Sequence, residues 1–120
     1  MQAGLIVVLM CLAAGLGLYL LTLHVRGVRK PVLIGVHVIL GFFATEQTVV
    51  TIKGSNYGDL LPPQPAGDLV ACFLGLALFA GLVGPLFQRK SPHVTERILI
   101  AHITLGAAAL VLALRWASTL

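Results

Sequence analysis

The sequence predicts an all-α membrane protein, a transmembrane up-down four-helix bundle built from two tandem two-helix repeats. Its 120 residues are 58% hydrophobic and only 10% charged, whereas average soluble domains are about 45–50% apolar and about 25% charged. The apolar residues gather in four runs, each close to the roughly 20 residues that cross a bilayer. One histidine-containing stretch also occurs twice. Four spans with three connections use the whole length, so we expect a single membrane domain over residues 1–120.

The spans are expected at about residues 5–23, 31–52, 69–87 and 98–116. Pro31 suits the first turn of a helix, where its missing N–H would have no intrahelical partner anyway. Residues 54–68 form the longest connection, a proline-rich loop that is neither helix nor central strand. Pro85 is expected to kink or stop the third helix. Cys11 and Cys72 lie inside apolar runs, and we expect small buried side chains without a disulfide.

Positive charge predicts the orientation of the chain. Loop 24–31 and loop 88–97 are basic, and they carry Arg26, Arg29, Lys30, Arg89, Lys90 and Arg97. The positive-inside rule therefore makes both of these loops cytoplasmic, with both termini and loop 54–68 outside. The sequence has no basic stripe with interleaved aromatic residues, so nucleic acid is not an expected partner. The expected partner is the lipid bilayer.

The duplicated stretch covers residues 35–44 and 100–109. His37 and His102 are separated by 65 positions (102 − 37), and at the same offset Leu40 matches Leu105, Gly41 matches Gly106 and Ala44 matches Ala109. Each histidine lies about five or six residues into its span, at roughly 7–9 Å depth. An imidazole in hydrocarbon is costly unless it has a partner. In an up-down bundle the second and fourth spans lie on a diagonal, so the two imidazoles can face each other across the axis.

These features predict one non-covalent haem b with His37 and His102 as axial ligands to its iron. We expect Gly35, Gly41 and Gly106, together with glycines on the first and third spans, to make room for the ring. Arg26, Arg29, Arg89 and Arg97 are the expected partners of the propionates, because a guanidinium pairs with carboxylates in a fork. The alternative is that each histidine only bonds a neighbouring helix and that the glycines only permit close packing.

This arrangement resembles the four-helix core of membrane b-type cytochromes, in which two histidines on alternate helices clamp a haem and glycines line it. Those families often bind two haems through two histidines on each ligand helix, whereas each helix here offers one. The resemblance implies electron transfer between a quinone or dehydrogenase partner and an acceptor. It also implies a larger complex with other membrane or redox subunits.

Glu46 is the other costly residue in a span, about 13 Å beyond His37 along the helix. It is a candidate proton or quinone site, and the alternative is a salt bridge with Arg115. His24 and His93 are expected at the cytoplasmic surface, solvated or near the propionates. A second haem that uses them would be poorly placed.

Two other functions are compatible with the sequence. The chain could be a cofactor-free structural subunit of a multi-subunit membrane complex, with the proline-rich loop as its docking surface. A small transporter or channel would depend on Glu46, because the spans hold little else that is polar. The sequence contains no nucleophile with a base and no phosphate-binding loop. We therefore expect an electron-transfer subunit rather than a stand-alone enzyme.

Overall fold

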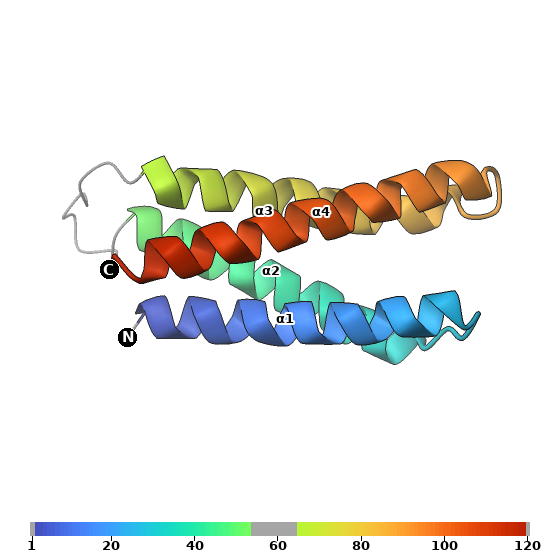
Figure 1. Cartoon of the computed structure of the whole chain (residues 1–120), viewed down its shortest axis with the longest axis horizontal. Coiled ribbons are helices and arrows are strands. Elements are labelled where there is room, and N and C mark those ends of the chain that lie inside the picture. The colour runs from blue at the N-terminus through green and yellow to red at the C-terminus, as the bar shows by residue number, and fades with distance from the viewer. Residues whose placement is uncertain (1, 54–64, 120) are drawn as a thin grey trace.

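Four long helices run along the major axis of the protein (Figure 1). The structure, a computed structural model, describes residues 2–53 and 65–119. The helices are α1 (Gln2–Val25), α2 (Pro31–Lys53), α3 (Pro65–Val83) and α4 (Pro92–Ala117), and the 3₁₀ helix η1 (Gly84–Phe87) follows α3. The described ranges contain no strand. The predicted all-α four-helix fold is confirmed.

All four helices are long and apolar enough to cross a membrane. Helices suit this environment because they satisfy every backbone N–H and C=O within the segment. The protein is therefore a multi-pass membrane protein. Both termini lie at one end of the bundle, and the α1–α2 and α3–α4 connections lie at the other (Figure 1). We call the end with the two termini the terminal end. The opposite end, which contains residues 26–30 and 88–91, is called the basic end.

The helices pack in a square arrangement. Helix α1 packs against α2 and α4, and α3 packs against the same two helices, so α2 and α4 lie on one diagonal of the bundle. The tightly packed core occupies the half nearer the terminal end. Its buried residues are Ile6, Met10, Ala44, Val70, Ala109, Ala113 and Trp116. Thr48 and Thr51 are also buried there, and each hydroxyl donates to the backbone carbonyl four residues earlier, at 2.8 Å.

The turn from α1 to α2 depends on Gly27. Its φ of 72° lies in the left-handed region, which glycine adopts without the clash that a Cβ causes. The Gly27 N–H donates to the His24 carbonyl at 3.0 Å, and the Val28 N–H donates to the Leu23 carbonyl at 2.9 Å. This pair of bonds is a Schellman motif, which ends the helix. Pro31 then begins α2, as predicted.

Two helices begin earlier in the sequence than the apolar spans predicted. Helix α3 begins at Pro65, so residues 65–68 of the predicted loop are helical, and residues 54–64 lie outside the described residues. Helix α4 begins at Pro92, so most of the predicted loop 88–97 belongs to its first turns. Proline at the start of a helix loses no intrahelical bond, and a helix can extend through polar residues beyond the membrane core. Pro85 stops α3 as predicted, because the α-helix tightens to a 3₁₀ turn there.

The prediction that the two cysteines are buried was wrong. Cys11 and Cys72 are free thiols on the outer surface of the bundle. An apolar run marks a residue as compatible with hydrocarbon, but it does not distinguish the bundle interior from the surface that faces lipid.

Candidate histidine site

His37 on α2 and His102 on α4 face each other across the diagonal of the bundle. Their ring centroids are 5.8 Å apart and their planes meet at 80°. Both side chains are half-buried. Two helices that make no backbone contact with each other are thus joined through their imidazoles. His37 follows the first residue of α2 by six positions (37 − 31), whereas His102 follows that of α4 by ten (102 − 92), so the two rings meet although they lie at unequal distances from the helix starts.

A backbone carbonyl selects the tautomer of His102. The His102 Nδ1 atom lies 2.6 Å from the Ala77 carbonyl oxygen on α3. A carbonyl oxygen only accepts, so Nδ1 must carry the proton and donate it. Nε2 is then left with a free lone pair. Histidines that bind metals commonly donate their other ring N–H to a carbonyl or carboxylate in this way.

His37 has a corresponding but incomplete environment. The backbone of Ala13 on α1 interacts with the His37 ring, as that of Ala77 does with His102. The His37 Nδ1 atom is nevertheless buried, and no group in the described part of the chain bonds to it. Ala13 is the counterpart of Ala77 in the first repeat, and its looser contact holds the His37 ring less firmly than the 2.6 Å bond holds the His102 ring.

Each histidine ring rests on a glycine of the preceding helix. A Cβ built on Gly17 would lie 3.0 Å from Cε1 of His37, and one built on Gly81 would lie 2.9 Å from Cε1 of His102. The contact at Gly81 is shorter than real Cβ contacts and the contact at Gly17 is tighter than most of them, so a side chain at either position would displace the ring. The repeat is thus preserved in three dimensions: Gly17 and Gly81 are 64 positions apart (81 − 17), and so are Ala13 and Ala77 (77 − 13).

The glycines emphasised in the sequence analysis lie elsewhere. A Cβ on Gly35 or on Gly106 would meet nothing within 4 Å, and one on Gly41 would lie 3.7 Å from the Leu78 side chain. None of them crowds a histidine. Gly17 and Gly81 had been grouped with the other glycines of the first and third spans. Their 64-position spacing, close to that of the histidines, is the sequence signal that could have singled them out.

The site can be tested for its fit to a haem on two measures. A metal–nitrogen bond of about 2 Å on each side, with about 1 Å from each nitrogen to its ring centroid, puts the two ligand centroids roughly 6 Å apart. The observed centroid distance is 5.8 Å. The histidines also lie in the half of the bundle that the tight core does not fill, where the buried residues are Leu23, Ala77 and Gly84. The centroid distance is compatible with two imidazoles that hold one group between them.

A bare metal ion fits less well. No group of three or more histidine, cysteine, aspartate or glutamate side chains gathers anywhere in residues 2–53 and 65–119. A structural zinc site needs about four protein ligands, and the described residues offer two imidazoles here. A porphyrin brings its own equatorial nitrogens, so two axial imidazoles complete its coordination.

The four predicted propionate partners lie at the basic end and divide into two pairs. Nη1 of Arg29 donates to Oε1 of Gln88 at 3.0 Å, and Arg29 and Arg89 line one groove between the two connections. Arg26 and Arg97 lie outside this groove. Arg97 belongs to α4, five residues before His102, or roughly 7–8 Å along the helix.

The two surface histidines do not join the central pair. Nε2 of His24 lies 2.8 Å from Oε1 of Glu96, and this exposed side-chain contact joins the end of α1 to the start of α4. His93 is exposed in the first turn of α4. The His24–Glu96 pair had no signal in the sequence, because its members are 72 positions apart.

Glu46 lies in a shallow groove between α2 and α3. The groove has a volume of about 290 Å³ and is lined by Phe42, Thr45, Glu46, Val49, Val50 and Leu78. The Thr45 hydroxyl donates to the Gly41 carbonyl at 2.8 Å, so the Glu46 carboxyl is the free polar group of this lining. The alternative salt bridge with Arg115 was wrong: the ion pair recorded among the described residues is His24–Glu96. Both Glu46 and Arg115 are exposed on the bundle surface.

Comparisons with known protein families, with curated proteins and with solved structures found no match to this chain. Functional inference therefore rests on the chemistry of the site.

Proposed function

We propose that this protein is a membrane b-type cytochrome that carries electrons through one haem held by His37 and His102. The observation that supports this best is the opposed pair of imidazoles, with ring centroids 5.8 Å apart, on diagonal helices. At this separation the two imidazoles would hold the iron of one haem between them. A haem bound in this way supplies one-electron redox chemistry.

The chain's own residues prepare the ligands. The Ala77 carbonyl holds the His102 ring through Nδ1, which orients Nε2. Gly17 and Gly81 let α1 and α3 approach the rings closely. Each imidazole is therefore confined on the side that faces away from the other imidazole. Confinement of this kind limits the reorganisation of the ligands during electron transfer.

The basic end is proposed to face the cytoplasm, as its positive charge favours. Arg26 and Arg97 are the proposed partners of the propionates, because Arg29 and Arg89 line a separate groove. Gly35, Gly41 and Gly106 are proposed to border the ring on the two ligand helices.

The Glu46 groove is the proposed place of proton exchange with a quinone. Its apolar lining suits an apolar ring and tail, and the carboxylate can accept or return a proton at its Oε atoms. Glu46 follows His37 by nine residues, or roughly 13 Å of helix. A single redox centre needs a donor and an acceptor, so the chain is proposed to work with other membrane or redox subunits.

The test is a reduced-minus-oxidised absorption spectrum of the purified protein, produced with ample haem. Wild type is expected to show a Soret band and a b-type α-band, and both should be lost or broadened in His37→Ala and in His102→Ala. His93→Ala is the matched control, because it removes an exposed histidine from α4 and should leave the spectrum unchanged.

A featureless spectrum in wild type would overturn the proposal. The histidines would then be packing residues, and a cofactor-free structural subunit would be the function to pursue. Loss of the bands in the His93→Ala control would argue against the His37–His102 pair as the ligands.

A further inference from the structure

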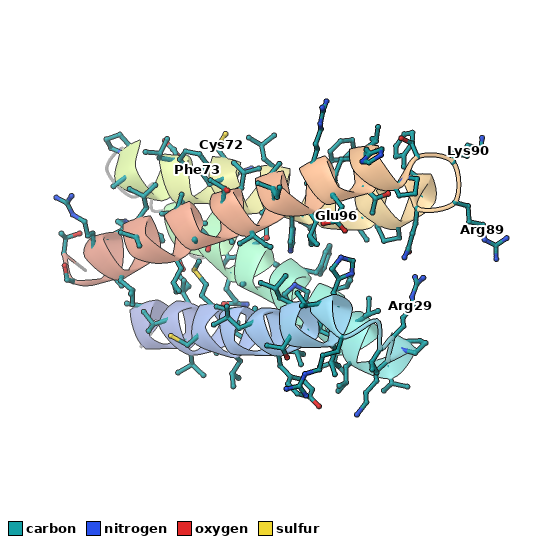
Figure 2. All side chains as sticks on the ribbon, turned by 45° about the vertical axis from the view of Figure 1, so that its right-hand side comes forward. Arg29, Cys72, Phe73, Arg89, Lys90 and Glu96 are labelled. Atoms are coloured by element: carbon teal, nitrogen blue, oxygen red, sulfur yellow. The ribbon has the colours of Figure 1, made fainter. Side chains whose placement is uncertain are left out.

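The two connections at the basic end enclose a groove with a volume of about 640 Å³. We call it the basic groove. It is lined by Arg29 from the α1–α2 connection and by Pro85, Leu86, Gln88, Arg89 and Lys90 from η1 and the α3–α4 connection. Arg29, Arg89 and Lys90 occupy the same end of the bundle in Figure 2. The groove therefore joins the two repeats on the side away from the termini.

The charge of the basic groove is entirely positive. Three of its six lining residues are cationic and none is acidic. Glu96, the acidic residue of the neighbouring helix turn, is paired with His24 instead. Three cations held close together repel one another, and an anion between them relieves this repulsion.

A hydrogen bond holds the two walls of the basic groove together. Arg29 donates from Nη1 to Oε1 of Gln88 at 3.0 Å. The Gln88 amide NH₂ and the remaining guanidinium N–H groups of Arg29 are then available as donors. Guanidinium and amide donors suit phosphate oxygens, which accept several hydrogen bonds at once.

The same groove has an apolar side. Leu86 is 73% exposed, and the adjacent Phe87 is 40% exposed. Both belong to η1, which continues the membrane-spanning segment Pro65–Phe87. An exposed leucine at this level faces the boundary between hydrocarbon and headgroups. A free inorganic anion would leave this surface uncovered, whereas a lipid would cover it with the start of an acyl chain.

We propose that the basic groove binds an anionic phospholipid, with its phosphodiester among Arg29, Arg89 and Lys90 and its acyl chain along Leu86. Basic pockets between membrane helices bind lipid headgroups by this combination of charge and depth. The bound lipid links the two repeats at the end where the tight core is absent. This inference does not rest on the haem proposal, because the groove contains neither histidine.

The experiment is native mass spectrometry of the purified full-length protein in detergent, with phosphatidylglycerol and phosphatidylcholine added at equal concentrations. Wild type is expected to retain phosphatidylglycerol preferentially. Each cation removed should weaken this preference about fivefold, so Arg29→Gln with Arg89→Gln should lower it about 25-fold. The control is Lys30→Gln, which removes one charge from the same end but from outside the groove, and it should retain the preference that Arg29→Gln alone weakens.

Two results would overturn the proposal. Equal loss in Lys30→Gln and in Arg29→Gln would mean that the lipid follows overall charge and not the groove. Displacement of phosphatidylglycerol by millimolar inorganic phosphate would make the groove a free-anion site. Persistence of the lipid in phosphate, together with its selective loss in the Arg29/Arg89 variant, supports the proposal.

Discussion

Adding one methyl group at Gly81 should damage the histidine site measurably. A Cβ there would lie 2.9 Å from Cε1 and 3.0 Å from Nδ1 of His102, so the ring must move away from the Ala77 carbonyl. Overpacking costs about 1–3 kcal/mol, and the lost hydrogen bond costs about 0.5–1.5 kcal/mol. Alanine recovers about 1 kcal/mol of helix propensity. The net loss for Gly81→Ala is therefore about 2 kcal/mol.

Gly17→Ala should cost less, about 1 kcal/mol. Its Cβ would meet Cε1 of His37 at 3.0 Å but Nδ1 only at 3.6 Å. The His37 Nδ1 atom has no hydrogen bond to lose within the described part of the chain, so this ring can shift more cheaply. Gly81→Ala is therefore predicted to destabilise the protein more than Gly17→Ala.

The assay is thermal unfolding in detergent, followed by the fluorescence of Trp116, the single tryptophan. At this chain length each kcal/mol corresponds to about 3–6 °C in Tm, so Gly81→Ala should lower Tm by about 6–12 °C. Gly15→Ala and Gly75→Ala are matched controls on the same two helices, since their Cβ atoms would meet nothing within 4 Å. They should leave Tm unchanged or raise it. Equal shifts in all four variants would refute the close approach of glycine to histidine.

Two further substitutions test the core and the Glu46 groove. Gly67→Ala would place a Cβ 2.8 Å from Cζ2 of Trp116 and 3.0 Å from Cγ1 of Ile52. Overpacking of this kind costs about 1–3 kcal/mol, so the substitution should lower Tm by a few degrees or more. A wild-type Tm in the same assay would contradict this packing. Glu46→Gln should slow reduction of the protein by a quinol about 100-fold or more, while reduction by dithionite is unaffected. Thr45→Val is the control, because the Thr45 hydroxyl bonds to a backbone carbonyl within α2. A wild-type rate of quinol reduction in Glu46→Gln would exclude the carboxylate from proton exchange.

Much of the fold was predictable because hydrophobic length is a local property. Four runs of about 20 apolar residues indicate four spans, whatever packs against them. The meeting of His37 and His102 was also predictable, since an even number of spans brings matching residues of the two repeats to the same level. Helix ends were less predictable. Residues 65–68 and 92–97 are polar or contain proline, yet helices extend through them.

Membrane helices carry a weak signal for which face is inside. In a soluble helix, polar residues mark the outer face, but here lipid and core are both apolar. The sequence therefore could not show that Cys11 faces outward or that Gly17, rather than Gly35, touches a histidine. It also could not show that Glu46 and Arg115 remain apart. Such choices depend on helix rotation.

The sequence by itself determined the number of spans, the duplication, the matching positions of both histidines in the two repeats and the concentration of positive charge at one end. These follow from composition and spacing along the chain. Only the tertiary structure decided that Gly17 and Gly81 support the rings, that Ala77 selects the His102 tautomer, and that Arg29 joins the basic groove. Each of these depends on atoms of different helices coming within about 3 Å. Helix rotation and crossing set such contacts, and a uniformly apolar sequence leaves both open.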